Sequence, residues 1–414
     1  MYKRHLSQSG DNIGAGCDAM KTRPTALLVQ QLGFTLVELM ISLVLSLLIV
    51  LALVTLLINV NRSNSELTSS GRMLENGRFA MQILENDVQH AGYWSGYVPA
   101  FDDLTTVGAP SDVPTAVPDP CLDYSALTTV DMVNLIGVAV QSYEIPATVP
   151  SPTLSVCASL VVSPKASTDV LFVRHTETCT AGAVDCMPHE EGNLYFQLAT
   201  CGDVAPSPAY AMSPYASATV GTDFPLQARA APASAPACTS AGLRKFDSSL
   251  YYIRNFADTA GDGIPTLVRS QLGVSSGTLA HQVAQPLIEG VEGFRVEFGI
   301  DNVSRSGAPA MPASEIAWAA SHPTEPTNRG DGVPDGNFIR CTTALPCTTA
   351  QLMHVVAVKL YVLVRSENAT PGYTDTKTYQ LGSSTLGPFG DGFKRHLFSQ
   401  TLRLTNIASR RETP

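Results

Sequence analysis

The stretch that decides the fold is "QQLGFTLVELMISLVLSLLIV", residues Gln30–Val50. The twenty residues of Leu39–Ile58 carry no charge, which is long enough for a helix that crosses a bilayer. A single carboxylate, Glu38, stands at the start of this apolar segment, where a charge costs a few kcal/mol. Such a charge predicts a functional residue. Gly33 and Phe34 precede it by five and four positions, and they need an explanation as well.

The apolar segment differs from an ordinary signal peptide, which has a core of roughly 7–15 apolar residues and a cleavage site of small residues. Here the core is longer, and the "INVNRSNSE" that follows from Ile58 contains no such site. A plain single-pass anchor explains the apolar run but not the residues just before it. Because Lys21 and Arg23 precede the segment, the positive-inside rule predicts a cytoplasmic N-terminus and an exported remainder.

The six residues "GFTLVE", Gly33–Glu38, resemble the processing site of type IV prepilins and of type II secretion pseudopilins. The resemblance implies that prepilin peptidase cleaves between Gly33 and Phe34 and removes residues 1–33 as a leader. Phe34 would then become the first mature residue, with a methylated amine, and Glu38 the fifth. This leader is longer than is usual in the family, whereas a start at Met20 would give the short basic leader "MKTRPTALLVQQLG".

Cleavage would also give Glu38 a partner. The new amine on Phe34 would lie about one helical turn from the Glu38 carboxylate, in the same chain or on a neighbouring subunit. A buried ion pair is tolerated in apolar surroundings where a lone buried charge is not. We therefore expect this pair to set the register between subunits of a filament more than to add stability.

The composition of the chain is that of an exported protein with long polar loops. Its 414 residues are 44% hydrophobic and only 15% charged, whereas soluble domains have roughly 25% charged residues. The formal net charge is −10, so the sequence has no excess of basic residues that would favour binding to nucleic acid or to an anionic membrane surface. We expect no nucleic-acid partner, which also argues against a pilin that takes up DNA.

The helix that begins in the apolar segment is predicted to continue beyond it. Residues 34–58 are the expected transmembrane and assembly helix, and residues 59–91 its amphipathic continuation. In the second part apolar side chains recur at helical spacing, at Leu67, Leu74, Met81, Leu84 and Val88. Gly71 and Gly77 each weaken the helix by about 1 kcal/mol relative to alanine, and Gly92 is a natural stop.

Residues 92–414 are predicted to form a β-rich globular head with long loops. Stretches rich in β-branched and aromatic residues are predicted strands: Thr168–Thr176, Asn193–Thr200, Ser249–Asn255, Pro265–Gln271, Glu292–Asp301 and His354–Arg365. The last alternates apolar and other side chains, which fits an antiparallel sheet with one face on a core. A soft boundary falls near Gly242. The predicted fold is therefore α+β and pilin-like, with a long N-terminal helix packed on an antiparallel sheet.

Three further stretches narrow the resemblance, because Gly77–Trp94, Pro286–Asp301 and Asp331–Asp335 are similar to segments of PilW-type minor pilins of type IV pili. This resemblance implies a structural protein and not an enzyme: a minor prepilin that enters the initiation or tip complex of the pilus. The implied partners are prepilin peptidase, other minor pilins and the major pilin through the N-terminal helix, and a tip adhesin. The implied location is the inner membrane, crossed once with the head in the periplasm, and then the extracellular pilus.

Two other functions remain open from the sequence. A type II secretion pseudopilin has the same motif and the same helix. A membrane-anchored periplasmic enzyme would need a catalytic group, and "GVSSG" at Gly273–Gly277 matches G-x-S-x-G, with Ser275 at its centre and His281 close by. A hydrolase nucleophile elbow requires a strand before the serine and a helix after it, and a loop of small residues is predicted here.

Eight of the nine cysteines follow the apolar segment, in a part of the chain that is predicted to be exported and therefore able to form disulfides. The expected pairs are Cys341–Cys347 and Cys179–Cys186, which close short loops, and then Cys121–Cys157 and Cys201–Cys238. Zinc is the alternative, because Cys179 and Cys186 lie near His189, but the C-x-x-C spacing of structural zinc sites is missing.

A loop in the second half of the head is a candidate for calcium. "NRGDGVPDG", Asn328–Gly336, places Asp331 and Asp335 at short spacing. Calcium takes several oxygen ligands, often from D-x-[DN]-x-[DN]-G loops, and this stretch does not complete that pattern. Turns between strands are expected, with calcium at Asp331 and Asp335 as the alternative and no other cofactor.

Overall fold

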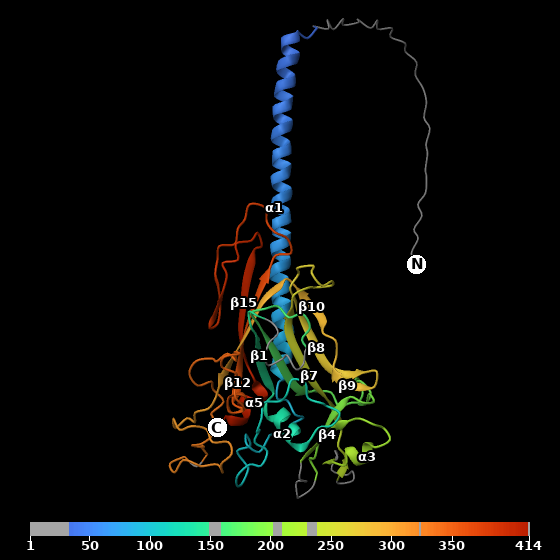
Figure 1. Cartoon of the computed structure of the whole chain (residues 1–414), viewed down its shortest axis with the longest axis vertical. Helices are drawn as coiled ribbons and strands as arrows, with labels where there is room; N and C mark the ends of the chain where they lie inside the picture. The colour runs from blue at the N-terminus through green and yellow to red at the C-terminus, as the bar shows by residue number, and fades with distance from the viewer. Residues whose placement is uncertain (1–32, 149–158, 202–208, 230–237, 323, 413–414) are drawn as a thin grey trace, which may run out of the picture. The chain divides into compact units, whose positions relative to one another are not determined.

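The computed structural model describes residues 33–148, 159–201, 209–229, 238–322 and 324–412. The chain divides into two compact units, one that ends at Ser63 and one that begins at Asn64. Helix α1, Leu36–His90, contributes to both units, and all the strands of the described residues belong to the second (Figure 1). The α+β fold class predicted from the sequence is confirmed.

In the first unit a short lead-in, Gly33–Thr35, is followed by the first turns of α1. The hydroxyl of Thr35 accepts a hydrogen bond from the backbone N–H of Glu38 at 3.3 Å. Threonine commonly caps a helix in this way, and negative charge is favourable in the first turn, where Glu38 stands. The helix therefore begins at Leu36, two residues later than predicted, because Thr35 is its cap.

The part of α1 that belongs to the second unit buries one face. The buried residues follow helical spacing: Met73, Gly77, Ala80, Met81, Leu84, Asp87 and Val88. Leu74 is half-buried, whereas Leu67, which was expected on the same apolar face, is 69% exposed. The helix ends at His90, and Gly92, with a φ of +74°, turns the chain away from the helix axis.

Gly77 is a packing contact rather than a weak point of the helix. A Cβ at this position would lie 2.0 Å from the Phe398 ring, which comes from strand β15, Arg395–Arg403. Only glycine allows the strand this close to the helix backbone. A Cβ on Gly71, by contrast, would have no other atom within 4 Å.

The first sheet of the second unit is antiparallel and has eight strands. Its main path is β1 (Val140–Ile145), β2 (Thr168–Thr176), β7 (Leu243–Arg254), β3 (Leu194–Leu198) and β4 (Tyr210–Pro214). Strand β8 (Thr266–Ser275) pairs with β7, and the last two strands, β9 (Thr278–His281) and β10 (Gln285–Glu289), both pair with β8. Because β2 pairs directly with β7, residues on both sides of Gly242 form one sheet. The soft boundary predicted there is absent from the described residues, which form one unit from Asn64 onward.

The second sheet has three antiparallel strands, with β12 (Val355–Arg365) between β11 (Val291–Ile300) and β15. The side chains on one face of β12 are completely buried: Val356, Val358, Leu360, Val362 and Val364. Lys359 is on the opposite face, with its ammonium over the ring of Tyr361. The predicted apolar face is therefore present, but the opposite face is largely buried as well, at Val355, Ala357, Tyr361 and Leu363.

The remaining elements are short. Two hairpins lie outside the sheets: β5 (Gln227–Arg229) with β6 (Cys238–Ser240), and β13 (Tyr379–Leu381) with β14 (Ser384–Leu386). The short helices are α2 (Thr129–Gly137), α3 (Val220–Asp223), α4 (Thr349–Leu352) and α5 (Thr405–Arg411). Of these, α2 begins with a capping box, in which Thr128 and Asp131 each accept a hydrogen bond from the other's backbone.

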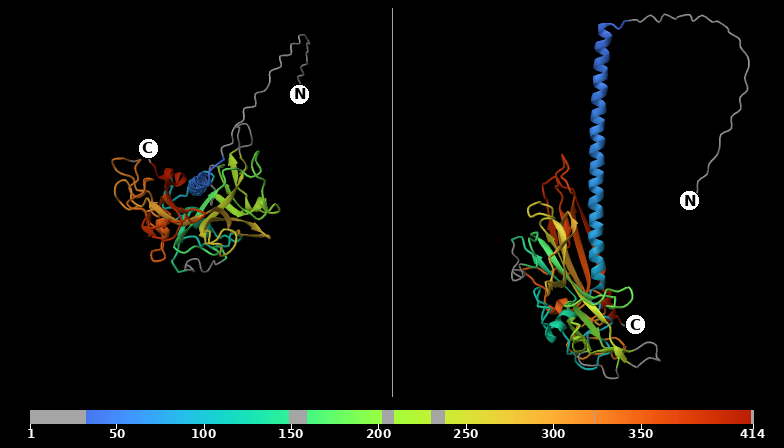
Figure 2. Two further views of the ribbon diagram at one scale, coloured as in Figure 1. Left: turned by 90° about the horizontal axis from the view of Figure 1, so that it is seen from above. Right: turned by 90° about the vertical axis from the view of Figure 1, so that its right-hand side faces the viewer.

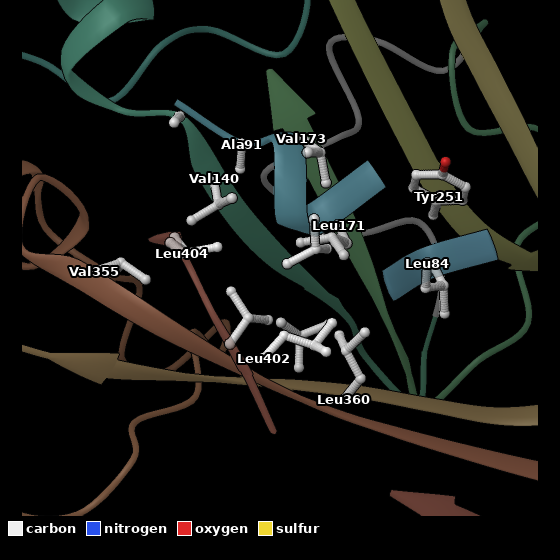
Figure 3. Close-up of a cluster of buried hydrophobic side chains, with 14 of the residues drawn as sticks. Leu84, Ala91, Val140, Leu171, Val173, Tyr251, Val355, Leu360, Leu402 and Leu404 are labelled. Carbon is white, nitrogen blue, oxygen red and sulfur yellow. The ribbon is translucent and has the colours of Figure 1, made fainter. Parts of the chain in front are cut away.

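The main core of the second unit lies between α1 and the two sheets. In Figure 3 side chains from all three converge: Leu84 of α1, Leu171, Val173 and Tyr251 of the first sheet, and Val355, Leu360 and Leu402 of the second. Seen from above, the strands of both sheets curve around one side of this part of the helix (Figure 2). The opposite side of the helix carries its exposed side chains.

Candidate functional site

The predicted processing site lies at the beginning of the described residues, outside any helix or strand. Gly33 has no atom within 4 Å of the place where a Cβ would be, and the Phe34 side chain is exposed. Among the described residues, nothing therefore covers the peptide bond between them. The cap between Thr35 and Glu38 lies entirely on the C-terminal side of this bond.

The apolar segment after this site is exposed all around the helix. Its large apolar side chains between Phe34 and Val60 keep 46–80% of their surface exposed in this chain. Within the described residues, α1 is the one helix that is long and apolar enough, by length and composition, to cross a membrane. So much apolar surface requires a cover, which a bilayer or other helices can provide.

The few hydroxyls within the apolar segment are satisfied by the helix itself. Ser42, Ser46 and Thr55 donate to the backbone carbonyls three residues earlier, at 2.9, 2.9 and 2.8 Å. In an apolar environment, polar groups must find their partners within the protein. These three bonds adapt the segment to surroundings without water.

Among the described residues the structure contains three of the disulfides that were expected from the sequence, Cys179–Cys186, Cys201–Cys238 and Cys341–Cys347. Cys121 is also disulfide-bonded, while Cys157, its expected partner, lies outside the described residues. Because Cys179 and Cys186 are bonded to each other, the zinc alternative with His189 is wrong.

The carboxylates of the loop that was the candidate for calcium accept hydrogen bonds from backbone N–H groups. Asp331 accepts from the backbone N–H of Val333 at 3.1 Å, and Asp335 accepts from that of Val303 at 2.7 Å. Asp301 in turn accepts from the backbone of Asp331 and Gly332, at 3.0 and 2.9 Å. Among the described residues, no three or more His, Cys, Asp or Glu side chains are grouped to hold a metal.

The G-x-S-x-G match is the turn of a β-hairpin. Ser275 pairs with Thr278, and the two residues between them, Ser276 and Gly277, have φ of +51° and +79°. A turn with two positive φ values joins tight antiparallel hairpins, and the helix that a nucleophile elbow requires is replaced here by strand β9. Ser275 is therefore not placed as a hydrolase nucleophile.

His281, at the end of β9, is half-buried and its ring packs against Tyr124 and Phe172 instead of lying at this turn. Its Nε2 lies 3.2 Å from the hydroxyl of buried Ser248. Burial, together with the charge of Arg174, lowers the pKa of His281 to about 4. The imidazole is therefore neutral and acts as a packed side chain of the sheet.

Buried arginines bind carboxylates from distant parts of the chain, which no sequence motif indicates. Arg395 of β15 lies 2.6 Å from Glu292 and 2.9 Å from Asp375. Arg340 lies 2.6 Å from Asp169, although 171 residues separate them. These ion pairs connect β2 and β11 with the loops around them, and each places a charge where it would be costly without its partner.

A third arginine fixes the C-terminal helix. Arg411 of α5 is bound to Asp102 at 2.8 Å and to Asp301 at 3.3 Å. It also donates to Nδ1 of His354 at 3.2 Å, so this histidine nitrogen must be an unprotonated acceptor. Burial and the charges of Arg411 and Arg329 lower the pKa of His354 to about 3.

Comparisons with known proteins concern mainly the C-terminal part of the head. Residues 250–406, fewer than half of the 414, match the family model described as Type IV Pilus-assembly protein W. A type IV-like pilin from Thermus thermophilus is similar over 53% of this chain and 86% of its own, with 14% sequence identity and a TM-score of 0.18. No curated protein sequence matches this chain. The predicted resemblance to PilW-type proteins is confirmed over residues 250–406.

Proposed function

We propose, on the premise that residues 250–406 match the type IV pilus-assembly protein W family, that this chain is a minor pilin of the initiation or tip complex of a type IV pilus. Two features that occur in the same chain support the proposal. One is the match to this family, and the other is an exposed apolar helix that begins directly after the Gly33–Phe34 bond. The role of such a protein is structural.

The first step in this proposal is cleavage after Gly33 by prepilin peptidase and methylation of the new amine on Phe34. The structure suits such a cut, because the bond lies outside the helix. The cap that starts the helix involves Thr35 and Glu38 alone. We therefore expect α1 to begin at Leu36 both before and after the leader is removed.

The second step is assembly through the apolar part of α1. Its side chains are exposed on every face, so they can leave a bilayer only by packing against other apolar helices. The Glu38 carboxylate would be neutralised there by the amine of Phe34, from the same chain or from the adjacent subunit. Where the pair joins two subunits, only one offset between them allows it to form, and this offset defines the register of the helices.

The size of the head supports a position at the tip or the base of the filament. The unit from Asn64 onward contains two sheets and long loops, and a head of this size is poorly suited to close repetition. The partners in this proposal are other minor pilins, the major pilin and a tip adhesin. The protein would span the inner membrane once, with a cytoplasmic N-terminus and a periplasmic head, and later become part of the extracellular pilus.

A type II secretion pseudopilin is the second candidate, because Gly33–Glu38 and the apolar part of α1 would serve it equally well. The family match over residues 250–406 favours the pilus. A periplasmic enzyme with Ser275 as its nucleophile is disfavoured, since that serine lies in a hairpin turn.

The test replaces Glu38 by glutamine in a strain that has this protein as its sole copy. Glu75, an exposed acidic residue on the same helix, provides the matched control as Glu75→Gln. Both variants should reach the membrane, and only Glu38→Gln should lose surface pili. Normal piliation with Glu38→Gln would contradict the register role of Glu38. Intact pili together with lost type II secretion would move the protein to the second candidate.

A further inference from the structure

Strand β15 is an outer strand of the second sheet, and only one of its two edges is paired. It pairs with β12 in unbroken register over nine residues. At the two ends of this pair, Leu404 donates to the carbonyl of Val356 at 2.8 Å, and Ser366 donates to that of Lys394 at 2.7 Å. Hydrogen bonding alternates along an antiparallel pair. The even-numbered residues of β15 therefore bond to β12, and the odd-numbered residues direct their N–H and C=O groups away from it.

The outward backbone groups of β15 have no hydrogen-bond partner among the described residues. They are the N–H and C=O groups of Leu397, Ser399, Thr401 and Arg403. Leu397 is half-buried, and the other three residues are exposed, so this edge is open to water and to other chains. The five residues from Leu397 to Thr401 include no charged residue, no proline and no glycine.

The other outer strands of the two sheets are protected in the part of the chain that the structure describes. At β11, Phe298 and Ile339 exchange two backbone hydrogen bonds, and Val296 donates to the carboxylate of Asp169. In the first sheet β1 is largely buried, β10 contains Pro286 and a break in register, and β4 and β9 have only five and four residues. Proteins protect strand edges in these ways because an open edge pairs with other chains. The middle of β15 has no such protection, which indicates that its edge is paired in the assembled protein.

A groove lies beside this edge, between β15 and α1 (Figure 1). The two elements run side by side in the same direction. Lys394, before β15, lies 3.5 Å from Glu66, and Asn406, after it, donates to the carbonyl of Gln89 at 3.1 Å. The groove contains a cavity of about 600 Å³, whose wall includes Gln400–Arg403 and Gln89. An added strand would therefore lie against α1 as well as against β15.

We infer that β15 binds an extended segment of another protein chain, which adds a strand to the second sheet through backbone hydrogen bonds. Unpaired backbone groups at a sheet edge select an extended segment over a helix. The outward groups from Leu397 to Arg403 provide partners for a strand of about seven residues. The side chains that it turns toward α1 should be polar, because Glu85, Gln89 and Gln400 line the groove.

A second copy of this chain is disfavoured as the source of the strand. A two-fold axis that pairs two β15 strands antiparallel would reverse the direction of β15 between the copies, and with it the direction of α1. Two chains that enter one membrane or one filament through α1 must have their helices in the same direction. The choice of a different subunit therefore rests on the proposed function.

The test measures the exchange of backbone amide hydrogens of β15 with deuterium, at single-residue resolution, by mass spectrometry. The purified full chain in detergent micelles is compared with the same chain in detergent-solubilised complexes from native membranes. In the purified chain the inward amides of Phe398, Gln400 and Leu402 should exchange slowly, and the outward amides of Ser399 and Thr401 should exchange fast. In the complexes the outward amides should exchange about tenfold or more slowly than in the purified chain, because a hydrogen bond then protects them.

Two variants at one position separate the backbone from the side chain. Thr401→Pro removes an outward N–H, and an outer strand tolerates proline where the N–H faces away from its neighbour. Thr401→Ala removes the side chain and keeps the N–H. In the complexes, Ser399 should lose its protection in Thr401→Pro but not in Thr401→Ala. Slow exchange of Phe398 and Gln400 in purified Thr401→Pro establishes that this variant is folded.

Three results would overturn the inference. Fast exchange of the outward amides of the wild type in the complexes would show that no strand is added. Equal protection of Ser399 in both variants would show that a partner covers the edge without pairing to it. Protection that appears in the purified chain and increases with its concentration would assign the edge to a second copy. The N-terminal peptide in the same spectra shows independently whether the chain begins at Phe34, which distinguishes failure of strand addition from failure of the proposed function.

Discussion

Replacing Gly77 by alanine should destabilise the head, although alanine is the better helix former. A Cβ on Gly77 would lie 2.0, 2.4 and 2.5 Å from three carbons of the Phe398 ring, well inside normal contact distance. Overpacking of this kind costs about 1–3 kcal/mol, whereas the change from glycine to alanine in a helix gains about 1 kcal/mol. The expected net result for Gly77→Ala is a loss of up to about 2 kcal/mol in the free energy of unfolding.

Gly71 provides the matched control, because it is on the same helix with nothing within 4 Å of its Cβ position. Gly71→Ala should therefore gain about 1 kcal/mol, and the two variants should differ by about 1–3 kcal/mol. The assay is urea unfolding of the full chain in detergent micelles, followed by near-ultraviolet circular dichroism. In a Phe398→Leu background the ring is gone, and the penalty at Gly77 should largely disappear. Equal stabilities for Gly71→Ala and Gly77→Ala would refute the close approach of β15 to α1.

The buried Arg395 and the exposed Arg403 of β15 should also behave differently. Arg395→Met should lower the free energy of unfolding by about 3–5 kcal/mol, because buried carboxylates lose their counter-charge, and Arg403→Met by no more than about 1 kcal/mol. Equal losses in urea unfolding would argue against the buried network. Replacing both cysteines of Cys201–Cys238 by serine should cost about 1.5 kcal/mol more than the same change at Cys179–Cys186, because the sequence separations are 37 and 7. Calorimetry that finds the reverse order would contradict this chain-entropy estimate. Burial and the neighbouring arginines lower the pKa of His354 to about 3, so this residue is neutral when folded but gains a proton below about pH 6.5 when unfolded. Acidification from pH 7 to pH 5 should then lower the free energy of unfolding of the wild type by about 2 kcal/mol more than that of His354→Gln. An identical pH dependence of the two stabilities would contradict the low pKa of His354.

Features with a local or periodic signal could be predicted from the sequence. The uninterrupted apolar run predicts α1, and the alternation in Val355–Arg365 predicts the buried face of β12. The short-loop cysteine pairs could be expected because nearby cysteines need little chain ordering to meet. The cap at Thr35 was not predicted, although threonine with glutamate three residues later matches the pattern of a capping box.

Features that depend on the tertiary fold left no such signal. Asp169 and Arg340 meet across 171 residues, and neither has a neighbour in sequence that indicates the other. Gly77 appeared as a weak point because helix propensity does not include the strand that packs on it. The cavity of about 430 Å³ at the end of α1 is lined by residues of α1, β2, β7 and β8, so only the folded chain brings Asp87 and Asp247 together.

The most direct test of the central claim is mass spectrometry of the N-terminal peptide, on protein recovered from native membranes or from sheared pili. The proposal predicts a peptide that begins at Phe34 with a methylated amine. A peptide that still spans the bond between Gly33 and Phe34, from a strain with active prepilin peptidase, would contradict the prepilin account and leave a membrane-anchored protein of another function.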